Sequence, residues 1–101
     1  MAETHPHPVA LITGAGRGIG RAIALALGRE GYSLCIAART REELEETRRL
    51  SSLPIERALI VLIDFADEES AEAVVETALD LFGRIDVVVN MPDGLRRAPH
   101  S

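Results

Sequence analysis

The apolar residues of this chain gather into four short, nearly continuous runs separated by polar stretches. The runs are Val9–Ile12, Tyr32–Ala38, Ala58–Ile63 and Ile85–Val89. Apolar runs of this length are typical of strands that are buried on both faces of a parallel sheet. We therefore predict one strand at each run.

The segments that follow the first two runs predict helices. The first helix is expected over Gly18–Arg29, with its apolar face at Ile19, Ala22, Ile23, Ala26 and Leu27. These positions recur with the period of an α-helix. Thr40 and Glu43 have the spacing of a capping box, which predicts a second helix that continues to about Leu50.

A third helix is expected between the third and fourth runs. Asp67 or Ser70 can cap its start, and the apolar spacing continues to Phe82, after which Gly83 closes it. The complete order is β-α-β-α-β-α-β. This alternation predicts an α/β fold with parallel strands and right-handed crossovers.

A glycine-rich stretch joins the first run to the first helix. It carries four glycines within seven positions, which are Gly14, Gly16, Gly18 and Gly20. Glycine lets the backbone turn tightly and approach a diphosphate, and the following helix offers unpaired N–H groups and the positive end of its dipole. Strand, glycine-rich turn and helix in this order predict a phosphate-binding loop. The simpler alternative is a glycine-rich turn before an ordinary helix.

The glycine spacing narrows this interpretation. The widespread pattern G-x-G-x-x-G requires glycine at position 19, where Ile19 stands. The pattern T-G-x-x-x-G-x-G is matched instead by Thr13, Gly14, Gly18 and Gly20. In this respect the sequence resembles the short-chain dehydrogenase/reductase family, over roughly residues 9–90.

The resemblance implies a partial Rossmann fold, with a parallel sheet of about four strands in the order 3-2-1-4 and helices on its flanks. It also implies a dinucleotide cofactor, bound by residues 9–90 acting as a half-domain. The loop residues expected to contact the cofactor are Gly14, Arg17, Gly18, Ile19 and Gly20. We expect residues 1–8 to form a flexible leader. Residues 91–101 depart from the family pattern, and we expect them to form a disordered tail.

The end of the second run bears on the choice between NAD and NADP. Ala37, Ala38 and Arg39 stand there, with no acidic residue at the tip. A carboxylate would repel a 2′-phosphate, whereas a guanidinium binds it through paired, charge-assisted hydrogen bonds. Arg17 supplies a second basic group, and the pair resembles the NADP-preferring members of the family. The alternative is that both arginines are solvent-facing charges only.

Two further strand ends carry candidate cofactor contacts by resemblance. Asp64 follows the third run, where an aspartate of the family accepts a hydrogen bond from the adenine amino group. Its structural alternative is to help cap the next helix. Asn90 ends the fourth run, where an asparagine can bridge backbone groups beside the cofactor ribose. Asp86, near the start of that run, is interpreted as structural.

The catalytic groups of the resembled family have no counterpart in this chain. The family uses a tyrosine, a lysine four residues later that lowers the tyrosine pKa, and a positioning serine. Tyr32 is the only tyrosine, Ile36 stands four residues after it, and all eleven basic residues are arginine. We therefore assign no catalytic residue.

Composition excludes several other classes of function. Hydrophobic residues make up 47% and charged residues 27%, which is typical of a globular domain. A net charge of −5 argues against non-specific nucleic-acid binding, and no run is long enough to span a membrane. His5 and His7 lack the partners of a metal site. The single cysteine, Cys35, lies in an apolar run, which predicts a buried thiol and a reducing, cytoplasmic location.

Three functional hypotheses remain open. The first is a truncated NADP-dependent oxidoreductase that acts on carbonyls or alcohols and has kept its cofactor-binding part. The second is a non-enzymatic module that binds NADP or a protein partner, and the third is a structural fragment that binds no nucleotide. In the strand order that the resemblance implies, Val87–Val89 of the fourth run are expected at an apolar sheet edge without a covering strand, which favours self-association through that edge.

Overall fold

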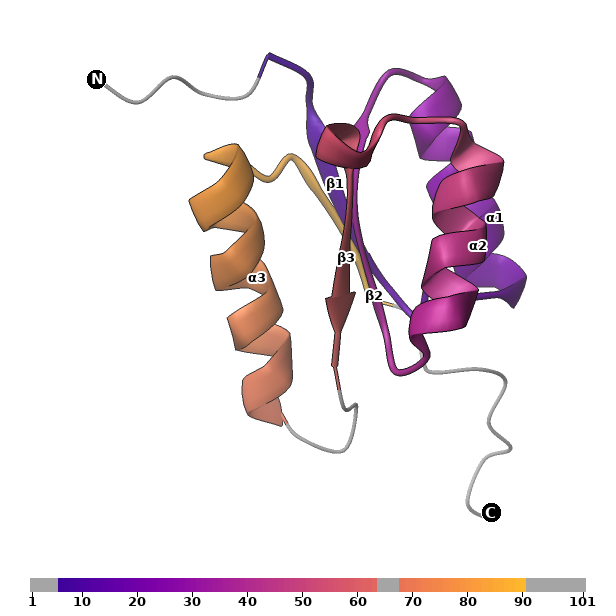
Figure 1. Ribbon diagram of the computed structural model, residues 1–101. Helices are drawn as coiled ribbons and strands as arrows, with labels where there is room; N and C mark the ends of the chain where they lie inside the picture. Colours follow the sequence, from indigo (N-terminus) through magenta and orange to yellow (C-terminus); the bar gives the residue numbers. More distant parts are fainter. Residues whose placement is uncertain (1–5, 64–67, 91–101) are drawn as a thin grey trace.

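The computed structural model describes residues 6–63 and 68–90 of the chain. Four parallel strands form one sheet in the order β3-β2-β1-β4, as the family resemblance implies. The elements, in chain order, are β1 (Val9–Thr13), α1 (Gly18–Arg29), β2 (Ser33–Ala38), α2 (Arg41–Ser51), the 3-10 turn η1 (Ile55–Arg57), β3 (Ala58–Leu62), α3 (Glu68–Phe82) and β4 (Val87–Asn90). Figure 1 shows the sheet between its flanking helices.

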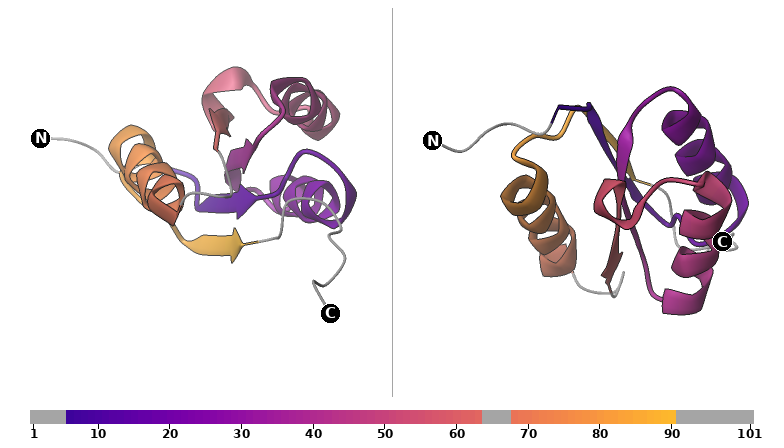
Figure 2. Two further views of the ribbon diagram at one scale, coloured as in Figure 1. Left: turned by 90° about the horizontal axis from the view of Figure 1, so that it is seen from below. Right: turned by 45° about the horizontal axis from the view of Figure 1, so that its top comes forward.

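The helices form two layers, with α1 and α2 on one face of the sheet and α3 on the other (Figures 1 and 2). Along β1, Ala10 and Ile12 face α1 and α2, whereas Val9 and Leu11 face α3. Both faces of the strand are therefore buried, which explains why its sequence is continuously apolar rather than alternating.

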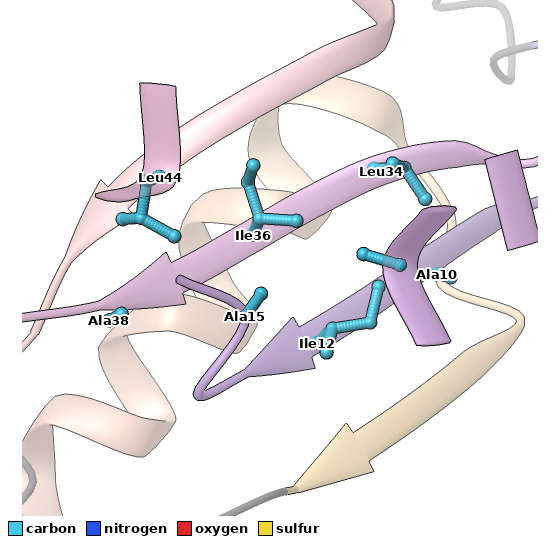
Figure 3. Packing of buried hydrophobic residues seen from close by; sticks show 8 residues of the cluster. Ala10, Ile12, Ala15, Leu34, Ile36, Ala38 and Leu44 are labelled. Carbon is cyan, nitrogen blue, oxygen red and sulfur yellow. The ribbon is translucent and has the colours of Figure 1, made fainter. Parts of the chain in front are cut away.

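The core beneath α1 and α2 is built from small and branched aliphatic side chains. Figure 3 shows Leu34 and Ile36 of β2 and Leu44 of α2 in this cluster, together with Ala15, which follows β1. Ala15 is fully buried. The start of the loop after β1 is thus anchored in the core.

The carboxyl ends of the strands meet at one edge of the sheet. Thr13 is in register with Ala37 of β2 on one side and with Asn90 of β4 on the other. In the next pair, Ala38 of β2 is opposite Leu62 of β3. In parallel α/β sheets, ligands bind beyond this edge.

The predicted apolar face of α1 is confirmed only in part: Ile23 is half-buried and Leu27 packs against the core, whereas the other predicted positions are exposed. The buried residues of α1 are Gly20 and Ala24, whereas Ala22 and Ala26 are exposed and Ile19 is 60% exposed. The reason is steric: the face that packs most closely against β1 and the loop carries the smallest side chains, and glycine does not register in an apolar count. Hydrophobic spacing alone therefore misses the two fully buried positions of this helix, Gly20 and Ala24.

The predicted capping box at the start of α2 does not form. Thr40 is the N-cap residue, but its side chain makes no capping hydrogen bond. Glu43 instead places its carboxylate 3.8 Å from the Nε atom of Arg17. Glu43 thus lies beside the glycine loop and Arg17.

Cys35 lies in the middle of the sheet, on the face covered by α3. It is fully buried as predicted, and burial raises the pKa of its thiol to about 12. The thiol is therefore a packing group with no reactive thiolate near neutral pH.

Candidate functional site

The candidate site is built around the glycine loop, residues 14–17, which joins β1 to α1. Gly14 has φ +68° and Gly18 has φ +64°, a left-handed conformation that favours glycine. At Gly20, an added Cβ would lie 2.0 Å from the carbonyl oxygen of Gly14. The loop therefore crosses directly over the first turn of α1. Glycine is favoured at positions 14 and 18 by the backbone conformation and required at position 20 by the close approach of the loop.

The first turn of α1 has the character of an anion site. Arg17 is the N-cap residue and makes no side-chain capping bond, and the first turn contains no acidic residue. The N–H groups of that turn and the positive end of the helix dipole are not satisfied by a side chain of the helix itself. A diphosphate oxygen can accept hydrogen bonds from these groups. A dinucleotide therefore fits the chemistry of this end of α1.

Two side chains that were not among the predicted site residues donate hydrogen bonds to carbonyl oxygens of the loop. Thr47 of α2 is fully buried, and its Oγ1 atom lies 2.8 Å from the carbonyl oxygen of Ala15. Arg21 of α1 places its Nη2 atom 2.6 Å from the carbonyl oxygen of Gly16. The available signal was the pattern of α2, where Leu44 and Thr47 are the uncharged residues among the charges of residues 41–49. Their i, i+3 spacing marks the inward face.

The ends of β1 and β4 are joined by a side-chain hydrogen bond beside the loop. The Thr13 hydroxyl donates to Oδ1 of Asn90 across 2.7 Å. This contact agrees with the backbone register, which pairs the two residues. Asn90 is thereby held at the point where the glycine loop begins.

The basic residues of the candidate site lie in two segments that the backbone brings together. The N–H of Ala15 donates to the carbonyl oxygen of Ala37 across 3.3 Å, which ties the loop to the end of β2 two residues before Arg39. Arg39 is exposed, and the Arg17 side chain is 70% exposed with Glu43 as its acidic neighbour. Two exposed arginines thus lie at this edge of the sheet, and one of them, Arg17, has a carboxylate beside it.

The remaining site predictions divide as follows. Ile19, in the first turn of α1, projects largely into solvent rather than into the core. Asp64 lies outside the described residues.

Within residues 6–63 and 68–90, no group of three or more His, Cys, Asp or Glu side chains could hold a metal ion. The same ranges contain no helix that is both long and apolar enough to cross a membrane.

Comparison with known proteins places this geometry in a family. A family model described as short chain dehydrogenase matches residues 8–95. A ketoacyl reductase assigned to the granaticin polyketide synthase of Streptomyces violaceoruber is 41% identical over 103 residues, which cover 100% of this chain and 40% of that protein. The chain therefore spans well under half the length of this relative.

Two solved structures share the fold. L-sorbose reductase from Gluconobacter frateurii, complexed with NADPH and L-sorbose, superposes with a TM-score of 0.76 at 38% identity, covering 91% of this chain and 35% of that one. A variant of actinorhodin polyketide ketoreductase with NADPH has a TM-score of 0.75 at 34% identity, covering 89% of this chain and 34% of that one. The chain belongs to the short-chain dehydrogenase/reductase family and corresponds to its N-terminal part.

Proposed function

We propose that this chain is the dinucleotide-binding part of an NADP-dependent short-chain dehydrogenase/reductase that acts on carbonyls or alcohols. The observation that carries the proposal is the first turn of α1: its N-cap residue, Arg17, makes no side-chain capping hydrogen bond, and the loop above it leaves room only for glycine at Gly20. We infer that the cofactor diphosphate lies over this turn. Its contacts there are proposed with Gly14, Gly18, Ile19 and Gly20.

The preference for NADP over NAD rests on the charges beside the loop. Arg39 follows β2 and is exposed, and Arg17 extends into solvent from the start of α1. We assign the 2′-phosphate to these two guanidinium groups, because they can bind it through charge-assisted hydrogen bonds. The L-sorbose reductase and the polyketide ketoreductase were both solved with NADPH, which supports this assignment.

The other cofactor contacts belong to two strand ends. Asn90, fixed by its hydrogen bond from Thr13, is proposed to order the backbone beside the ribose. Asp64 is proposed to accept a hydrogen bond from the adenine amino group. When bound, the cofactor supplies the hydride, and the residues of this chain bind and orient it.

We further propose that the 101-residue chain does not turn over substrate by itself. It contains no lysine, and its single tyrosine, Tyr32, packs half-buried against the core cluster beneath α1 and α2. A tyrosine in that position cannot reach a substrate beyond the carboxyl ends of the strands. Proton transfer to or from a substrate therefore needs groups that this chain does not place at the site.

Calorimetric titration with NADPH and with NADH tests the cofactor assignment. We expect NADPH to bind more tightly, and Arg39→Asp to reverse the order because the new carboxylate repels a 2′-phosphate and accepts ribose hydroxyls. Arg29→Asp, an equal charge change at the far end of α1, is the control and leaves the order unchanged. Equal affinities for the two cofactors in the unmodified chain would refute the role of Arg39. Hydride transfer by this chain alone would refute its proposed inactivity.

A second candidate function is partner binding through the sheet edge formed by β4. Among the described residues, β4 pairs with β1 and is the last strand on its side of the sheet, and Val88 is 57% exposed on it. An apolar edge strand is a template for pairing with another chain. We propose that the chain associates with a second copy of itself through this edge.

We also assign it to the cytoplasm, where the single buried thiol of Cys35 stays reduced.

A further inference from the structure

We propose that Arg21 and Thr47 are positioning residues that hold the glycine loop in the shape required for nucleotide binding. This inference rests on the proposed function and extends it from the residues that would touch the cofactor to two that act through the loop. Thr47 belongs to α2 and Arg21 to α1, so the contact joins both helices to the loop between them.

Thr47 stands at the centre of the contact because its hydroxyl both donates and accepts. The nearest acceptor is the carbonyl oxygen of Ala15 at 2.8 Å, and the carbonyl oxygen of Glu43, one turn earlier in α2, lies at 3.1 Å. The Nε–H of Arg21 donates to Oγ1 of Thr47 across 2.9 Å. Since Thr47 is fully buried, bulk water does not compete for these partners.

Arg21 completes the contact with the second arm of its guanidinium. Its Nη2 atom donates to the carbonyl oxygen of Gly16 across 2.6 Å and to that of Glu43 across 3.1 Å. One planar group thus reaches the loop, the backbone of α2 and the hydroxyl of Thr47. The ammonium of a lysine is a single point of donation and cannot reproduce this fork.

The consequence for the loop follows from peptide geometry. The described backbone contains no cis peptide bond, and in a trans peptide the C=O and N–H groups point in opposite directions. The carbonyl groups of Ala15 and Gly16 are directed to Thr47 and Arg21. The N–H groups in the same two peptides, those of Gly16 and Arg17, are therefore directed away from this contact. On that side of the loop they can donate hydrogen bonds to an anion.

A loop that is rich in glycine needs such a constraint. Glycine has more backbone freedom in the unbound state than any other residue, and ordering it on binding opposes affinity. Gly14, Gly16 and Gly18 give residues 14–18 three such positions. By fixing two carbonyl groups in advance, Arg21 and Thr47 reduce the ordering that a nucleotide must impose.

Thr47→Val tests the proposal because it keeps the shape of the side chain and removes its hydrogen bonds. We expect the Kd for NADPH to rise about tenfold, in line with the loss of a buried hydrogen-bonded contact. Thr47→Ser restores the hydroxyl and is expected to keep the Kd within about twofold of the unmodified chain. Arg21→Lys is expected to weaken binding to an intermediate degree, because the charge remains and the fork is lost.

The matched control is Thr77→Val. Thr77 is a half-buried threonine of α3, which lies on the opposite face of the sheet from α1 and α2. We expect this variant to bind NADPH as the unmodified chain does. A control that weakens binding as much as Thr47→Val would refute a specific role for Thr47.

Amide hydrogen exchange without nucleotide separates this proposal from the proposed function. Thr47→Val and Arg21→Lys are expected to speed exchange at residues 14–18 while the amides of β2 stay protected. If the unmodified chain binds no nucleotide, the proposed function fails, whereas faster loop exchange still supports the positioning role. Unchanged loop exchange in Thr47→Val, or equal acceleration across the whole sheet in both variants, would overturn the proposal.

Discussion

At the scale of single residues, Gly20 is the position where one methyl group meets the backbone of the glycine loop. A Cβ there would lie 2.0 Å from the carbonyl oxygen of Gly14 and 2.8 Å from its carbonyl carbon. Real Cβ atoms do not approach backbone so closely, so the loop or the helix must shift. The requirement for glycine at position 20 is therefore one of close approach, since its φ is not in the left-handed region.

Gly20→Ala is expected to lower the free energy of unfolding by about 1–3 kcal/mol, the usual cost of overpacking. Thermal melting followed by circular dichroism measures the change. Gly28→Ala is the control, because its Cβ would meet Leu53 Cδ1 at an ordinary 3.4 Å in the last turn of the same helix. There, alanine is expected to stabilise the chain, by no more than the roughly 0.5–1 kcal/mol that separates alanine from glycine in the middle of a helix. Equal effects of the two substitutions would contradict the steric argument.

At the scale of elements, the strands were predictable because burial on both faces leaves continuous apolar runs. The resemblance to a known family supplied their order. The contacts of Arg21 with Thr47 were not predictable, since the two residues are 26 positions apart and meet only when α1 and α2 pack together. The absence of the capping box at Thr40 was not predictable either, since local spacing does not show that Glu43 lies beside Arg17, a residue of a distant segment.

The amino ends of β1 and β4 are joined by Asp86, which the sequence analysis interpreted as structural. Its Oδ2 atom accepts a hydrogen bond from the N–H of Val9 at 2.8 Å, and its own N–H donates to the carbonyl oxygen of Val9 at 2.8 Å. Arg84 binds the same carboxylate at 2.8 Å. The hydrogen bond from Arg84, followed by that from Val9, lowers the pKa of Asp86 below its ordinary value of 3.8. The charged form is thus the one that the folded chain stabilises.

Asp86→Asn is expected to lower the melting temperature at pH 7, because it removes the charge from both contacts. A carboxyl group with a lowered native pKa stabilises the fold above its unfolded pKa, and this contribution is lost as the pH falls through 3.8 and below. The difference between the two chains should therefore shrink in acid. Glu46→Gln, which breaks an exposed pair with Arg49 inside α2, is the control with little effect expected. A difference that stays constant from pH 7 to pH 3 would refute the electrostatic role.

At the scale of the whole molecule, the strands of the sheet differ in how far they are buried from solvent. Its two inner strands, β1 and β2, are buried along their whole length, and β4 alternates between half-buried and exposed positions. Val87 and Val89 pack against the core cluster beneath α1 and α2, while Val88 points to the other face. The helix on that face, α3, packs over β1 and β2 and leaves Val88 largely uncovered.

Self-association of this chain is expected to depend on Val88 because an edge strand offers backbone N–H and C=O groups together with an apolar side chain. In sedimentation experiments over a range of concentrations, Val88→Lys is expected to weaken association by about tenfold, since a lysine on an edge strand opposes pairing with a second strand. Leu81→Lys is the matched control, because Leu81 is 62% exposed on α3 and lies off the sheet edge. Association that weakens equally in both variants indicates general apolar contact instead of edge pairing. A chain that sediments as a monomer at every concentration would rule out the interaction itself. The concentration series therefore tests whether the chain associates, and the two variants test where it does.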